Sequence, residues 1–82
     1  MQREWEIVER VGAQPARIVL LYGEKWKVTV YIWYNIEGKS IKREFCRARV
    51  ERAGEVPIIF SVLEDFKKFL AIQGLPELPI YL

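Results

Sequence analysis

A long hairpin pattern in the middle of the chain constrains the fold more than any other feature. Residues 26–34 (WKVTVYIWY) are dense in β-branched and aromatic side chains, which are typical of a strand. Asn35 and Gly38 then bracket a turn in the manner of a three-residue hairpin loop formed by residues 36–38. Residues 39–50 return as the next strand. This pattern predicts an antiparallel sheet.

Two shorter strands are expected before this hairpin. Residues 5–11 (WEIVERV) mix apolar and charged side chains in the pattern of a half-buried strand, and residues 17–22 (RIVLLY) are apolar on both faces. Gly23 and Glu24 predict a two-residue turn into the long hairpin, because a type II′ turn has glycine at its first central position. The strands should therefore follow one another as a meander.

A single helix is expected after the sheet. Apolar residues between positions 62 and 70 fall at helical spacing on one face. Ser61 and Glu64 match a capping box for the first turn, and Gly74 suits the C-terminal end. Residues 75–82 are apolar and are expected to dock on the body or on a partner. The predicted fold is α+β: a four-stranded antiparallel meander followed by one C-terminal helix and an apolar tail.

Length and composition predict one domain with a binding function. Residues 1–82 leave no room for two cores. Cys46 is the only cysteine and histidine is absent, which argues against a structural zinc site and against histidine acid–base chemistry. No enzyme activity, metal or cofactor is expected. A domain this small, without a disulfide, is often helped by association, so a homo-oligomer is expected.

The sequence also suggests where the protein is located and what kind of organism it comes from. No apolar run approaches the length of a membrane span, and no apolar signal segment stands near the start of the sequence. A lone cysteine fits a reducing compartment, so a cytoplasmic location is expected. Few Asn, Gln, Ser and Thr residues stand among many Glu, Lys and Arg, a bias that predicts a thermophilic source.

The expected turns divide the sheet into two faces of different chemistry, because register decides which side chains share a face. One face, with Val19, Leu21 and Val28, is apolar and suits the helix. The other face contains Ile18 and Leu20 and is too apolar to stay bare, yet a single helix covers only one side. The candidate binding residues on this second face are Lys27, Tyr31, Trp33, Arg43, Phe45, Arg47 and Arg49.

These residue types point to two kinds of partner. Aromatic rings provide platforms for unstacked bases, and cationic side chains contact phosphates, so single-stranded nucleic acid is one expected partner. Protein interfaces are also enriched in aromatic residues and arginine. A homodimer or another protein partner bound through the same face is therefore the alternative, and both remain open.

Two segments carry a resemblance to a known family. Residues 25–50 (KWKVTVYIWYNIEGKSIKREFCRARV) and residues 61–74 (SVLEDFKKFLAIQG) place aromatic and basic strands before a helix. This layout resembles the archaeal ThermoDBP-related single-stranded-DNA-binding proteins and, more loosely, the C-terminal domain of the positive-cofactor-four transcription coactivators. The resemblance implies that an oligomer binds single strands with little sequence preference.

Overall fold

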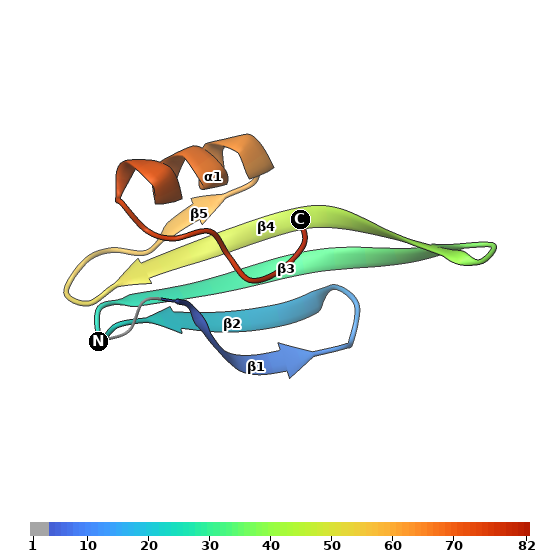
Figure 1. Cartoon of the computed structure of the whole chain (residues 1–82), viewed down its shortest axis with the longest axis horizontal. Coiled ribbons are helices and arrows are strands. Elements are labelled where there is room, and N and C mark those ends of the chain that lie inside the picture. The colour runs from blue at the N-terminus through green and yellow to red at the C-terminus, as the bar shows by residue number, and fades with distance from the viewer. Residues whose placement is uncertain (1–3) are drawn as a thin grey trace.

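The computed structural model describes residues 4–82 as one antiparallel sheet with a helix and a tail packed on it (Figure 1). Residues 1–3 of the predicted domain lie outside the described residues. The strand order is β1-β2-β3-β4-β5, so each strand pairs with its neighbour in the chain. The elements are β1 (Glu6–Val11), β2 (Ala16–Tyr22), β3 (Trp26–Glu37), β4 (Ser40–Arg52), β5 (Ile58–Phe60) and the helix α1 (Leu63–Ile72).

The predicted α+β class and the antiparallel meander with a C-terminal helix are confirmed, and the structure adds a fifth strand. β5 is only three residues long and pairs with the C-terminal part of β4. Three residues are too few to give a periodic signal in the sequence. Among residues 4–82, no helix is long and apolar enough to cross a bilayer.

The β3–β4 hairpin extends beyond the other strands (Figure 1). Glu37 pairs with Ser40, so only Gly38 and Lys39 connect the two strands. Gly38 has a φ of 60°, a left-handed conformation that costs glycine little. The predicted three-residue loop of residues 36–38 is therefore wrong. Near this turn, each β3 residue pairs three positions further along β4 than predicted.

A β-bulge in β4 changes the register once more. Ile32 pairs with Phe45 whereas Tyr31 pairs with Arg47, which leaves Cys46 as an extra residue. Beyond the bulge, each β3 residue pairs four positions further along β4 than predicted. Because side chains alternate between faces, an offset of three exchanges the faces and an offset of four preserves them. The predicted faces are right for β4 beyond the bulge and wrong near the hairpin turn.

The register of β2 also differs from the prediction. A three-residue loop, residues 23–25, connects β2 to β3 instead of the predicted two-residue turn. Ile18 and Leu20 consequently pair with Val30 and Val28 and face the helix. Their neighbours Val19 and Leu21 lie on the opposite face. The predicted assignment of β2 residues to the two faces is wrong because one loop residue was missed.

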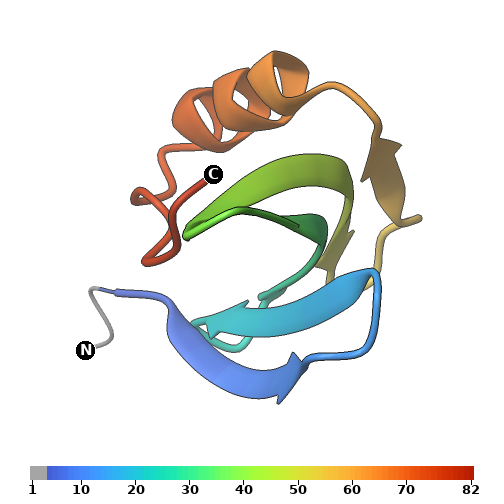
Figure 2. The ribbon, with the colours of Figure 1, turned by 90° about the vertical axis from the view of Figure 1, so that its right-hand side faces the viewer.

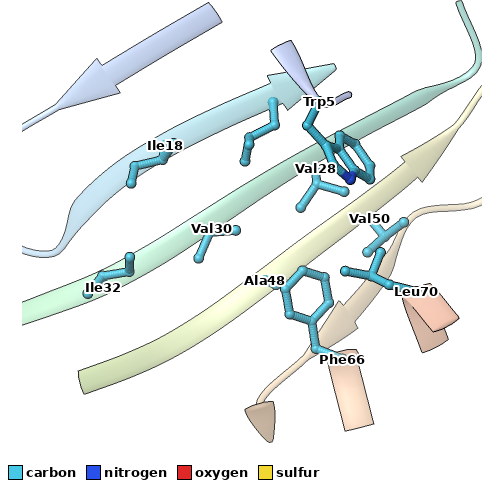
Figure 3. Close-up of a cluster of buried hydrophobic side chains, with 10 residues drawn as sticks. Trp5, Ile18, Val28, Val30, Ile32, Ala48, Val50, Phe66 and Leu70 are labelled. Carbon is cyan, nitrogen blue, oxygen red and sulfur yellow. The ribbon is translucent and has the colours of Figure 1, made fainter. Parts of the chain in front are cut away.

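The sheet is curved, and α1 and the C-terminal tail lie on its concave side, here named the inner face (Figure 2). Leu75, Leu78, Ile80 and Leu82 of the tail pack on the core, and the indole N–H of Trp5 donates to the Pro76 carbonyl oxygen at 2.9 Å. The tail therefore docks on the body of the protein. The buried core residues (Figure 3) are Trp5, Ile18, Leu20, Val28, Val30, Ile32, Ala48, Val50, Phe66 and Leu70.

The prediction for the N-terminal end of α1 is wrong, and the prediction for its C-terminal end is confirmed. Val62 is the N-cap and no side chain caps this end, so the predicted capping box from Ser61 is wrong. At the other end Gly74 has a φ of 71°. Its N–H donates to the Ala71 carbonyl at 3.0 Å, and the Leu75 N–H donates to the Leu70 carbonyl at 3.0 Å. This is a Schellman motif, and it confirms the glycine at the helix end.

Candidate nucleic-acid interface

Neither α1 nor the tail crosses the convex side of the sheet, here named the outer face (Figure 2). Alternate residues of β3 lie on it, and their partners on β4 bring Arg47 and Arg49 to the same side. Val19 and Thr29 are buried beneath the longer side chains and form its floor. Five of the seven predicted binding residues lie together here and are named the outer-face cluster: Lys27, Tyr31, Trp33, Arg47 and Arg49.

Tyr31 is the centre of a row that crosses three strands. It pairs with Arg17 of β2 on one side and with Arg47 of β4 on the other. The Arg47 guanidinium carbon lies 4.2 Å from the centroid of the Tyr31 ring, within the range of a cation–π contact. An arginine cation thus lies over a half-buried aromatic ring, with a second arginine on the neighbouring strand.

Arg17 is a member of this row that sequence reasoning missed. The two-residue turn predicted before β3 placed it on the face of the helix; a three-residue loop would have placed it correctly. Its Nη2 atom donates to the Glu9 carboxylate at 2.9 Å. Its Nε atom is buried and has no hydrogen-bond partner among residues 4–82. Arg17 therefore keeps an unsatisfied donor next to Tyr31.

Trp33 is the most exposed aromatic side chain of the outer-face cluster, with 42% of its surface accessible. β2 begins at Ala16, which pairs with Ile32, so no β2 residue lies beside Trp33. On the other side Trp33 pairs with Glu44 of β4. The ring is exposed because it lies on the part of the hairpin that extends past β2.

Carboxylates balance most cations of the outer face. Glu51 lies 3.9 Å from the Lys27 ammonium and 3.5 Å from the Arg49 guanidinium, and Glu9 pairs with Arg17. Such exposed ion pairs are worth about 0–1 kcal/mol, so a phosphate competes with them at small cost. Arg47 has no carboxylate within ion-pair distance among the described residues, which leaves its charge available to a ligand.

Phe45 and Arg43 do not belong to the outer-face cluster, contrary to the prediction. Phe45 lies on the inner face and stacks on Phe66 of α1, with ring centroids 6.0 Å apart and planes 18° apart. Arg43 lies beside Tyr34, 6.0 Å from its ring centroid, in a recess of about 190 Å³ that Arg10 also lines. Both residues precede the bulge in β4, where the offset of three positions exchanges the faces.

Other features do not point to a different site. An apolar pocket of about 270 Å³ lies between α1 and the tail, lined by Leu70, Leu75 and Leu78 among others. No group of three or more His, Cys, Asp or Glu side chains suited to a metal ion occurs within residues 4–82. Comparison with family models, curated proteins and solved structures finds no match. The geometry of the outer face is thus the basis for a functional proposal.

Proposed function

We propose that the chain is a non-enzymatic module that binds single-stranded nucleic acid on the outer face of its sheet. The observation that carries this proposal is an uncovered face on which Arg47 lies over Tyr31 and Trp33 stands exposed two positions along the same strand. Rings accept bases by stacking, worth roughly 1–3 kcal/mol per base, and arginines contact the phosphates.

The spacing of the two rings favours an unstacked single strand over a duplex. Residues two apart on a strand lie about 7 Å from one another. Consecutive bases of one strand in a duplex rise by only about 3.4 Å, and their faces are covered by their neighbours. A base can stack on Trp33 and on the Arg47 guanidinium that lies over Tyr31, so the two positions suit bases that are splayed apart.

The charges of the outer face favour weak, salt-sensitive binding with little sequence preference. Arg47 has no ion-pair partner within residues 4–82, whereas Arg17, Lys27 and Arg49 must first release their ion pairs with carboxylates. If two or three phosphates are neutralised, log K falls with log salt with a slope of about −1.4 to −2 for a single strand. A slope of about −2.8 would mean that Arg17, Lys27, Arg47 and Arg49 all contact phosphates.

Fluorescence anisotropy of a labelled oligothymidine at low salt tests the proposal with matched variants. Arg47→Gln is expected to weaken binding about tenfold and to reduce the salt slope by about 0.7, the share of one phosphate. Arg43→Gln removes the same charge from the same strand but from the inner face, so binding should be unchanged. Equal losses in both variants, or no binding by the unmodified chain at micromolar concentration, would refute the proposal.

A homodimer through the same face is the alternative outcome, and Trp33→Glu separates the two. If the outer face binds nucleic acid, this variant loses oligothymidine while light scattering reports an unchanged oligomeric state. If instead a second copy covers the outer face, the dimer dissociates. We also propose a cytoplasmic location, which fractionation of source cells tests, and a thermophilic source.

A further inference from the structure

The two edges of the sheet are protected very differently. β1 carries Glu6, Glu9 and Arg10, and a register shift leaves Val8 as an extra residue, so charges and a bulge discourage pairing with another strand. β5 lies within residues 56–63 (VPIIFSVL), which contain no charged residue. Pro57 is the only edge-protecting residue type in this segment, and it precedes the strand.

Aliphatic side chains are exposed all along the β5 edge. The exposed fractions are 86% for Val56, 44% for Ile58, 62% for Ile59 and 53% for Val62. β5 pairs with β4 on one side only, so its outer backbone N–H and C=O groups face away from the sheet. The natural occupant of such an edge is an extended strand with apolar side chains.

We propose that this occupant is β5 of a second copy, paired antiparallel about a two-fold axis at Ile59. In this register Ile59 lies opposite its own counterpart, and Ile58 lies opposite Phe60. The segment is thus self-complementary, as a two-fold interface requires, and no charge is brought against another. An 82-residue chain buries a smaller share of its surface than a larger domain, which adds to the benefit of association.

The dimer would have one continuous sheet. An axis perpendicular to the sheet keeps both inner faces on one side, so the two copies of α1 cover the same side and the two outer faces merge. Arg49 pairs with Ile59 across the β4–β5 ladder and would lie next to the axis. The proposal does not depend on nucleic-acid binding, and its tests are made without nucleic acid.

Sedimentation of the full chain is the first test. The unmodified chain should be a dimer, and Ile59→Lys should be a monomer with an unchanged circular dichroism spectrum. Ile72→Lys is the matched control, because Ile72 is 80% exposed on α1 and lies outside the interface. A monomer at every concentration up to about 1 mM would overturn the proposal. A dimer that resists Ile59→Lys but dissociates on Trp33→Glu would overturn it as well.

Disulfide trapping tests the register without a disruptive side chain. In a Cys46→Ser background, Ile59→Cys should form a crosslinked dimer under mild oxidation, because directly opposed residues have Cα atoms about 4.5–5.5 Å apart, within the reach of a disulfide. Ile72→Cys, at an exposed position of α1 outside the interface, should not crosslink. Equal crosslinking of Ile59→Cys and Ile72→Cys would show random collision and contradict the proposed pairing.

Discussion

Phe66 holds α1 on the sheet, and its truncation to alanine is expected to be severe. The side chain is fully buried, and its ring centroid lies 6.0 Å from Phe45 of β4 and 5.8 Å from Phe60 of β5. Truncation of a buried Phe to Ala costs roughly 3–5 kcal/mol. At roughly 0.05–0.15 kcal/mol per residue, 82 residues have a total stability of about 4–12 kcal/mol. Phe66→Ala should therefore remove a quarter or more of the stability.

Urea unfolding followed by tryptophan fluorescence measures this loss. We expect the free energy of unfolding to fall by about 4 kcal/mol. Ile72→Ala on the same helix should change it by less than about 0.5 kcal/mol, because that side chain is exposed. Both variants are compared at one fixed protein concentration, since association stabilises the folded state. A loss below about 1.5 kcal/mol for Phe66→Ala would refute the reasoning that this ring attaches the helix.

Three smaller predictions concern single residues, and a fourth concerns the thermal stability of the whole chain. Trp5→Phe removes the hydrogen bond to the Pro76 carbonyl and should cost about 1 kcal/mol, with faster amide exchange in the tail. Gly74→Ala should lower the free energy of unfolding, measured with urea, by about 1 kcal/mol. The cost comes from the left-handed φ alone, since no atom lies within 4 Å of the added Cβ. Phe45→Leu should reduce stability yet leave oligothymidine affinity unchanged. The melting midpoint of the unmodified chain should exceed the roughly 45–65 °C typical of mesophilic domains, by calorimetry.

The parts of the fold that were predicted correctly depend on local patterns. The long hairpin was visible because residues 26–34 combine β-branched and aromatic side chains over more than one strand length. The helix was visible because Phe66 and Leu70, its buried residues, fall four positions apart on one face. Each pattern is complete within its own segment, so no knowledge of the partner strand was needed.

The parts that were missed depend on competition between segments. Ser61 has the residue type of a helix cap, yet the helix accepts its first hydrogen bond at the Val62 carbonyl, from the N–H of Phe66 at 3.2 Å. β5 ends at Phe60, so Ser61 is used to turn the chain from the sheet edge toward the inner face. Residue type predicted a favourable cap, but the path of the chain decided where the helix begins.

The outer-face cluster shows why the candidate site was only partly predictable. Side-chain alternation establishes that Lys27, Tyr31 and Trp33 share a face, whatever lies beside them. It carries no information about which β4 residues join them, because that depends on the number of residues in the turn and on any bulge. The predicted turn was wrong by three positions, and the bulge at Cys46 added a fourth. The total shift of four positions is even, so Arg47 lies on the same face as Tyr31, although the β3 partner predicted for Arg47 was wrong.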